Sequence, residues 1–224
     1  MSAEQDHGAA VRLRCVTSGY QLGTPVITDL TVDLPGRGLT NVRGRNGSGK
    51  STLLELYSGY LRPWQGTVEV CGHPASSPGA RLLRRTCRTR SALYPHMTAQ
   101  DHLHFASRCV GTDPGAALVR AERHGLGPWL GYAAAALSTG NARKLWYLMC
   151  TLGEFAVAFL DEPFNGLDEE GVAVVRDELR AWAATGAVLL ISHALPPDVR
   201  PDAVFTLTAA HQGVEILRPA PHVP

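Results

Sequence analysis

Residues Gly44 to Ser51 read GRNGSGKS, and this stretch decides the fold. It matches the pattern G-x-x-x-x-G-K-[ST] in full. Its glycines let a loop wrap an anion with backbone N–H groups, and a helix that begins near Lys50 adds the positive end of its dipole. A β-type run, Leu39–Arg43, precedes the loop and an apolar helix follows it. The sequence therefore predicts a phosphate-binding loop between a strand and a helix.

This loop indicates a P-loop NTPase without saying which kind. Lys50 can reach the β- and γ-phosphates of a nucleotide, and the Ser51 hydroxyl can ligate Mg²⁺. The alternative is a chance match in a glycine-rich chain, which the strand–loop–helix context disfavours. The residues expected to contact the nucleotide here are Gly44, Arg45, Asn46, Gly47, Ser48, Gly49, Lys50, Ser51 and Thr52.

A second group of functional residues follows an apolar run. Phe155–Glu162 reads FAVAFLDE, which describes a buried strand with two carboxylates at its C-terminal end. Ligand sites of parallel α/β sheets lie at that edge. Asp161 is expected to hold Mg²⁺, and Glu162 to polarise the attacking water as general base. A strand that simply runs into an acidic turn is the alternative, and the P-loop upstream makes it the weaker one.

Apolar β-type runs alternate with helical patterns along the chain. Lys50–Tyr57 reads as a helix, and a second helix carries Val172, Val175 and Leu179 on one face, with Asp168 as its N-cap. Residues 98–152 read instead as helix and loop, with Thr98 as an N-cap. An α/β core with a largely parallel sheet and an inserted helical subdomain is predicted. The expected strands are Val11–Thr17, Leu30–Leu34, Leu39–Arg43, Thr67–Val70, Phe155–Leu160, Val188–Ile191, Ala203–Thr208 and Val214–Leu217.

Composition limits the class of protein. The 224 residues carry a net charge of +1, so the whole-chain charge does not point to nucleic acid. The five cysteines are scattered without a CxxC pair, which argues against zinc or a disulfide framework and favours a reducing cytosol. No stretch approaches the roughly 20 apolar residues of a membrane-spanning helix, so a membrane role is expected only through a partner.

A third motif identifies a family. Ala136–Leu145 reads ALSTGNARKL and resembles the signature sequence of the nucleotide-binding domains of ABC transporters, with LSTGN at the five signature positions before the Asp161 strand. In that family the signature binds the γ-phosphate held by the P-loop of the opposite subunit. Ser138, Gly140 and Asn141 are therefore expected to contact ATP across a dimer. Without the resemblance, LSTGN would indicate only a capped helix start.

The resemblance covers nearly the whole chain and implies further roles. Asn165–Asp168, NGLD, resembles the loop that communicates across the dimer, so Asp168 is expected near the nucleotide. His193 resembles the switch histidine that senses the γ-phosphate, and Tyr20 the aromatic that stacks on adenine. Residues 1–224 are expected to form one ABC ATPase domain, a P-loop NTPase core with a mostly parallel, RecA-like sheet and an antiparallel β subdomain. The core is expected in 10–85 and 153–218, and the helical subdomain in about 88–152.

One departure from the family concerns a glutamine that normally contacts Mg²⁺ and water. Counting back from ALYPHMTAQDHL places this position at Thr89 or a neighbouring arginine. Thr89 keeps a hydroxyl but is shorter, so hydrolysis is expected to remain possible while the coupling step comes into doubt. The adjacent arginines, from Arg81 to Arg90, form either a solvated basic face or a contact for an acidic partner or anionic lipid.

The expected function is that of a transport ATPase subunit, closer to bacterial exporters than to importers. The resemblance implies ATP and Mg²⁺, a second ABC domain and a membrane-spanning permease, with the chain cytoplasmic and peripheral on the inner face of the cell membrane. No nucleic-acid partner is expected. The alternatives are a non-transport ABC ATPase, or a nucleotide-gated switch with weak hydrolysis, which the missing glutamine motivates.

Overall fold

A six-stranded sheet forms the centre of the molecule, in the strand order β10-β9-β3-β8-β7-β6. The structure, a computed structural model, describes residues 8–208 and 215–217. Strands β9, β3, β8, β7 and β6 run parallel to one another, and β10 pairs antiparallel with β9 at one edge. Their bounds are Gly38–Gly44 for β3, Arg84–Cys87 for β6, Val157–Asp161 for β7, Ala187–Ile191 for β8, Ala203–Leu207 for β9 and Glu215–Leu217 for β10.

The central strands are buried on both faces. In β7, Val157 and Phe159 pack into one hydrophobic cluster, whereas Ala158 and Leu160 pack into another on the opposite face. Successive residues of β7 thus face opposite sides of the sheet, and both sides are apolar. The run is therefore apolar throughout, as expected for a parallel strand that is covered on both faces. The predicted α/β class with a mostly parallel sheet is confirmed.

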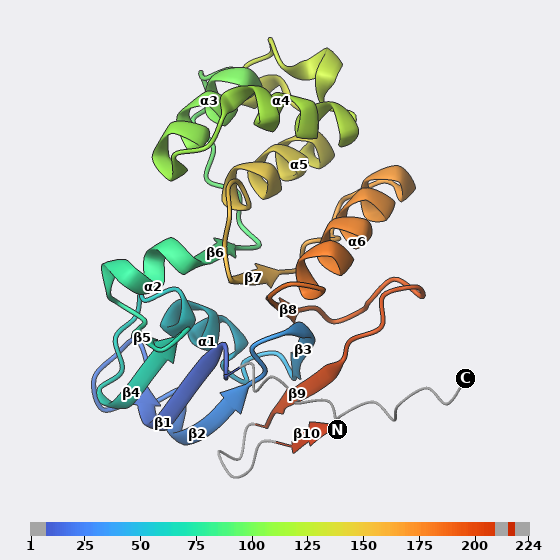
Figure 1. Cartoon of the computed structure of the whole chain (residues 1–224). Coiled ribbons are helices and arrows are strands. Elements are labelled where there is room, and N and C mark those ends of the chain that lie inside the picture. Colours follow the sequence, from blue (N-terminus) through green and yellow to red (C-terminus); the bar gives the residue numbers. More distant parts are fainter. Residues whose placement is uncertain (1–7, 209–214, 218–224) are drawn as a thin grey trace.

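A second sheet is antiparallel and has the order β2-β1-β4-β5. Helix α1 (Lys50–Tyr57) contacts strands of both sheets, and its Tyr57 ring lies 5.3 Å from the ring of Phe159. One hydrophobic cluster joins α1, the antiparallel sheet and one face of the central sheet. Figure 1 shows α1 next to the antiparallel sheet. The bounds are Val11–Ser18 for β1, Ile27–Leu34 for β2, Gln65–Val70 for β4 and His73–Pro74 for β5.

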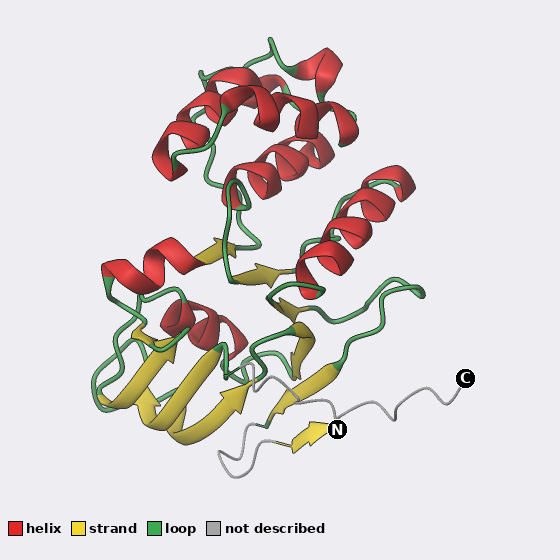
Figure 2. Ribbon diagram, viewed as in Figure 1, coloured by secondary structure: helices red, strands yellow, loops and turns green. Residues whose placement is uncertain are grey.

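Helices are concentrated at the opposite end of the molecule from the antiparallel sheet (Figure 2). There α3 (Ala99–Val110), α4 (Pro114–Arg123) and α5 (Thr139–Cys150) share a hydrophobic cluster of their own. Thr98 accepts a bond from the Asp101 amide, which confirms the predicted N-cap. Two single-turn 3₁₀ helices, Gly127–Trp129 and Ala134–Ala136, lie between α4 and α5.

The elements that were not predicted include α2 (Pro78–Leu83), β6 and the two-residue strand β5. The β6 sequence is RRTC, so its hydrophobic pattern is too weak to indicate a strand. Its arginines are satisfied by carbonyl groups, because Arg84 donates to Ala75 O at 2.5 Å and Arg85 donates to Leu152 O at 2.6 Å. The predicted first core segment ended at residue 85, inside this strand.

The other strand predictions fall on strands, with small shifts at the ends. β7 begins at Val157 rather than at Phe155, and β2 begins earlier than predicted, at Ile27. Val214, the predicted start of the last strand, lies outside the described residues. Within the described part of the chain, no helix combines the length and apolarity needed to cross a bilayer.

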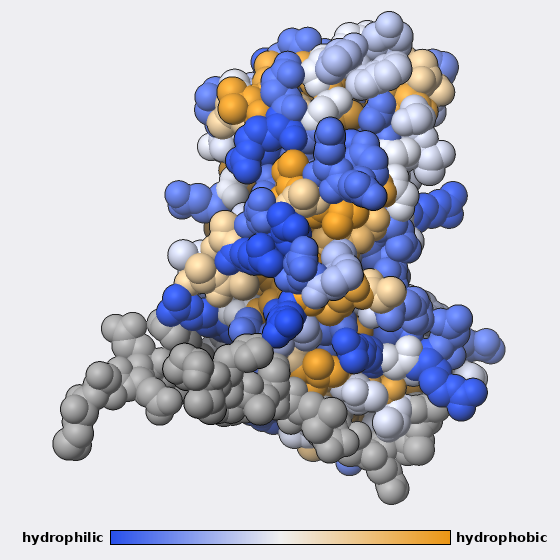
Figure 3. Space-filling view, turned by 90° about the vertical axis from the view of Figure 1, so that its right-hand side faces the viewer, coloured by the Kyte–Doolittle hydropathy of each residue, from blue (hydrophilic) through white to orange (hydrophobic). Residues whose placement is uncertain are grey.

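Helix α6 (Glu169–Ala183) packs on the central sheet, on the face opposite α1. Asp168 accepts a bond of 2.8 Å from the Gly171 amide and so caps the helix, as predicted. Polar and apolar residues are intermixed on the side of the molecule that carries α6 (Figure 3). On the outer surface of α6, Arg176 pairs with Asp177 at 3.0 Å and with Asp198 at 3.5 Å.

The helices α3, α4 and α5, hereafter the helical group, are joined to α6 by a buried ionic network. Arg120 of α4 donates to both carboxylate oxygens of Glu178 at 2.7 Å, and the Tyr147 hydroxyl donates to the same carboxylate at 3.0 Å. His124 Nε2 lies 3.3 Å from Glu178 Oε1. Burial alone would raise the pKa of Glu178, but the hydrogen bonds and charges of Arg120 and His124 lower it to about 2.

Replacing Glu178 by Gln is expected to destabilise the fold by about 3–5 kcal/mol, because Arg120 is left as a buried charge without its counter-ion. Urea unfolding measures this free energy. The matched control is Asp198→Asn, which breaks an exposed pair and is expected to cost less than about 1 kcal/mol. Equal losses in the two variants would contradict a stabilising role for the network.

The same pair predicts a dependence on pH. The folded-state pKa of Glu178 lies below its unfolded value of about 4.3, so the stabilisation is present above that value. It is lost as the pH falls towards about 2. The difference in unfolding free energy between the wild type and Glu178→Gln should therefore be constant near neutral pH and shrink below about pH 4.3.

Candidate functional site

A cleft of about 600 Å³ lies at the C-terminal ends of β3, β7 and β8. It brings together residues that are far apart in the chain. Its lining includes the side chains of Tyr20, Lys50, Ser51, Asp161, Glu162 and His193, with part of the P-loop. All six are among the residues that the sequence predicts at the site. Asn165 and Thr89 line it as well.

The backbone of the P-loop is shaped for a phosphate. Gly47 and Gly49 have φ angles of 79° and 100°, in the left-handed region where only glycine avoids strain. At Gly44 there is no room for a side chain, since an added Cβ would lie 2.7 Å from Leu207 O. The loop leads directly into α1, so its amide groups and the helix N-terminus act on the same volume.

Lys50 is held by the loop itself. Its ammonium donates to Gly44 O at 2.7 Å and to Arg45 O at 3.0 Å. Ser51 is exposed, whereas Thr52 is buried and its hydroxyl lies 3.5 Å from the Tyr20 hydroxyl. Tyr20 is 63% exposed, which leaves its ring open at the rim of the cleft.

The two acids lie at the C-terminal end of β7 in different environments. Asp161 is the last residue of β7, and Thr89 Oγ1 donates to its Oδ2. Glu162 has a φ of 48°, a left-handed conformation that costs about 1–3 kcal/mol in a residue with a side chain. The Glu162 carboxylate accepts bonds from the His193 amide at 2.9 Å and from the Ser192 hydroxyl at 3.1 Å. These bonds fix the carboxylate beside the cleft.

His193 is positioned by β8, which ends at Ile191. Its ring Nε2 lies 4.0 Å from Glu162 Oε1, and its side chain is 59% exposed. The ring is therefore anchored near the acid through its own amide and still faces solvent. Sequence patterns did not indicate Ser192, although it directly precedes the predicted histidine.

The signature residues are placed elsewhere. Ser138 caps α5 by accepting a bond of 3.2 Å from the Asn141 amide. Gly140 lies against Gly166, since a Cβ there would come within 3.0 Å of Gly166 O. Among the described residues, none of the signature positions lines the cleft of its own chain. In a single chain the predicted contacts of Ser138, Gly140 and Asn141 with the nucleotide are therefore not assembled.

Asp168 also lies outside the cleft. Lys144 pairs with it at 3.0 Å, and this hydrogen bond, with the one from the Gly171 amide, lowers the pKa of Asp168. The side chain thus caps α6 and ties it to α5, which is a structural task in the single chain. Arg143 of α5 adds a link that no sequence pattern indicates, because it donates to Glu162 O at 2.9 Å and to Asp161 O at 3.2 Å.

The residues at this site fit a magnesium nucleotide. Glycines with left-handed backbone and a lysine suit the phosphates, and the side-chain oxygens of Ser51 and Asp161 are ligands of the kind that Mg²⁺ prefers. Within the described ranges, no cluster of three His, Cys, Asp or Glu side chains offers a transition-metal site.

Known proteins are similar to this chain over most of its length. The ABC transporter family model matches residues 27–165. The cytochrome c biogenesis ATP-binding export protein CcmA of Cupriavidus pinatubonensis is 31% identical over 180 residues, which cover 78% of this chain and 80% of that protein. The retinal-specific phospholipid-transporting ATPase ABCA4 of Homo sapiens is 28% identical over 200 residues, covering 85% of this chain but 9% of ABCA4.

Solved structures agree with the fold. An ATP-binding subunit of an ABC transporter superposes with a TM-score of 0.80 at 25% identity, covering 89% of this chain and 86% of the other. A dimeric bacterial ABC transporter cassette has a TM-score of 0.80 at 15% identity, covering 93% and 98%. The family match spans more than half of the chain and includes the P-loop and the acid pair. The chain therefore belongs to the ABC transporter family, as one of its ATP-binding, ATP-hydrolysing subunits.

Proposed function

We propose that two copies of this domain, or this domain and a similar one, close on ATP and so drive a separate membrane-spanning permease in export. One observation carries this proposal: the cleft assembles the P-loop with Asp161 and Glu162, while Ser138 and Gly140 of the same chain lie outside it. A second subunit would supply the signature to complete each site. The dimeric cassette among the solved structures and the export protein CcmA support this reading.

The chemistry follows from the residues in the cleft. The P-loop amides and Lys50 would bind the phosphates, and Ser51 and Asp161 would hold Mg²⁺, which would neutralise charge on the phosphates. Glu162 takes a proton from the attacking water, and its carboxylate is already fixed by the His193 amide. Tyr20 stacks on the adenine, and His193 contacts the γ-phosphate. Asp168 and Asn141 lie on the side of the second subunit.

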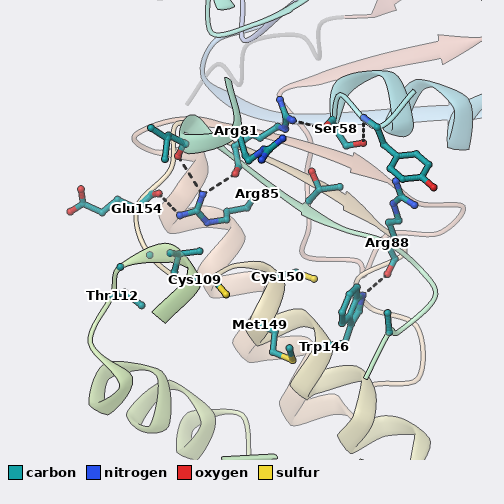
Figure 4. A pocket seen from close by; sticks show the side chains of 18 of the residues that line it. Ser58, Arg81, Arg85, Arg88, Cys109, Thr112, Trp146, Met149, Cys150 and Glu154 are labelled. Atoms are coloured by element: carbon teal, nitrogen blue, oxygen red, sulfur yellow. Dashed lines mark hydrogen bonds between the residues drawn. The ribbon is translucent and has the colours of Figure 1, made fainter. Parts of the chain in front are cut away.

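A groove of about 1280 Å³ lies between β6 and the helical group. It is the proposed docking site for the permease, which would hold the chain on the cytoplasmic face of the membrane. Figure 4 shows Arg81, Arg85 and Arg88 in the lining of the groove. Arg90 lines it as well. Arg85 donates to the carbonyl groups of Leu152 and Glu154, so its charge is not neutralised there.

Apolar residues line the groove as well, among them Trp146, Met149 and Val110. A lining of both arginines and apolar side chains fits a segment that carries both acidic and apolar residues. A solvated basic face alone would not require the apolar residues, and nucleic acid is not expected because stacking aromatics do not interleave with the arginines along the chain.

A nucleotide-gated switch with weak hydrolysis is the second candidate. The observation that favours it is the hydrogen bond from Thr89 to Asp161 at the position where the family has glutamine. A non-transport ABC ATPase shares the same cleft and would lack the permease.

The first test measures ATP hydrolysis by the purified chain beside a Glu162→Gln variant. We expect the variant to lose a factor of about 10²–10⁴ in rate while still binding ATP, because it lacks only the proton acceptor. Glu170→Gln, an exposed change in the first turn of α6, is the control. A wild type that binds ATP and dimerises without hydrolysing it would favour the switch.

A second prediction concerns the loop. Gly49→Ala should lower ATP affinity about tenfold or more, since the added Cβ forces the left-handed loop and its amide groups out of place. Gly72→Ala is the matched control, with a φ of 76° and open space around the added carbon. Similar ATP affinities for the two variants, measured by equilibrium binding, would count against phosphate binding by this loop.

The groove makes a third prediction. The double variant Arg81→Glu with Arg90→Glu should move the chain from the membrane fraction to the supernatant in cells that contain the permease, because like charges then oppose docking. ATP binding should persist. The control, Arg12→Glu with Arg123→Glu, reverses two exposed arginines elsewhere and should stay on the membrane. The same distribution for both variants would show that the groove is not the docking site of the permease.

A further inference from the structure

The loop after β6 touches the acid that is proposed to hold the metal. Thr89 is exposed, yet its hydroxyl donates to Asp161 Oδ2 across the edge of the sheet. The contact arises from topology, because β6 and β7 are parallel neighbours with Cys87 opposite Leu160. Thr89 lies two residues after Cys87 and Asp161 one residue after Leu160, and both line the cleft. Among the described residues, no hydrogen bond occupies the other oxygen, Oδ1.

The backbone that carries Thr89 is itself held in place. The preceding carbonyl, Arg88 O, accepts a bond of 3.0 Å from the indole N–H of Trp146 in α5 (Figure 4). The Arg88 guanidinium lies over the Tyr60 ring at 4.7 Å and is 3.8 Å from Glu55. Arg88 is thus fixed on both its main chain and its side chain, so the hydroxyl of the next residue has little freedom to leave the acid.

The Asp161 end of the contact is also fixed. Arg143 donates to the carbonyl groups of Asp161 and Glu162, which holds the backbone at the end of β7. The carboxylate itself can still turn about its side-chain torsions. A hydroxyl that donates to Oδ2 restricts this rotation and leaves Oδ1 for a cation. A donated bond to a carboxylate is among the stronger hydrogen bonds in proteins.

We propose that Thr89 is a positioning residue that orients the Asp161 carboxylate for Mg²⁺, and that the bond between Trp146 and the Arg88 carbonyl keeps Thr89 in place. The proposal deepens the proposed function and rests on it, since it assumes that magnesium nucleotide binds in this cleft. In this role the threonine hydroxyl acts on the metal ligand rather than on the water or the phosphate.

The test measures the gain in affinity for a nonhydrolysable ATP analogue when Mg²⁺ is added, by equilibrium binding with and without the metal. Thr89→Val removes the hydroxyl at nearly constant volume and is expected to lower this gain about tenfold, while affinity without metal stays unchanged. Thr89→Ser keeps the hydroxyl and should restore the gain. Trp146→Phe should lower it in the same direction by a smaller factor.

The matched control is Thr86→Val, which changes the same residue type on β6 at a position that lines the groove instead of the cleft. It should leave the gain unaltered. An undiminished gain in Thr89→Val would overturn the proposal, as would a loss of affinity that is equal with and without Mg²⁺. A wild type that binds no nucleotide under either condition would instead overturn the proposed function.

Discussion

Parallel pairing in the central sheet is the constraint on which the rest of the molecule depends. Because β3, β6, β7 and β8 run the same way, their C-terminal ends meet at one edge. The P-loop follows β3 at this edge, the acid pair lies at the end of β7, and His193 follows β8. The pairing of Asp161 with Ile191 and the bond from the Glu162 amide to Ile191 O fix the register of β7 and β8. This register places the two acids beside His193. A slip of one residue would separate them.

Glu162 illustrates how the fold stores strain where chemistry is performed. Its left-handed backbone is unfavourable for a residue with a side chain, and it is retained because three neighbours define the conformation. The Ser192 hydroxyl and the His193 amide hold the carboxylate, and Arg143 holds the carbonyl. The last contact comes from the signature helix, so a movement of α5 acts directly on the backbone of the proposed general base.

Besides the bonds from Arg143 to the Asp161 and Glu162 carbonyl groups, further polar contacts connect the helical group to the core. The Glu178 network joins α4 and α5 to α6, Lys144 joins α5 to Asp168, and Trp146 joins α5 to the tip of β6. The first is deeply buried and the other two lie closer to solvent. The β6 tip is also where the arginine groove and the nucleotide cleft come within one residue of each other, with Arg88 lining one and Thr89 the other. A ligand in the groove would thus contact the segment that carries the proposed positioning residue, Thr89.

The sequence by itself determined the strands of the central sheet other than β6, the P-loop, the acid pair and the caps at Thr98 and Asp168. These features are local: each follows from a run of side chains or from a turn whose backbone needs glycine or a capping oxygen. Sequence did not indicate β6, because a strand of sequence RRTC is stabilised by distant carbonyl groups instead of by a hydrophobic pattern. Nor did it indicate Ser192 or Arg143 as partners of the acids, or the bond between Thr89 and Asp161. Those contacts join residues 18 to 72 positions apart, and only the parallel packing of the strands and of α5 brings them within hydrogen-bonding distance.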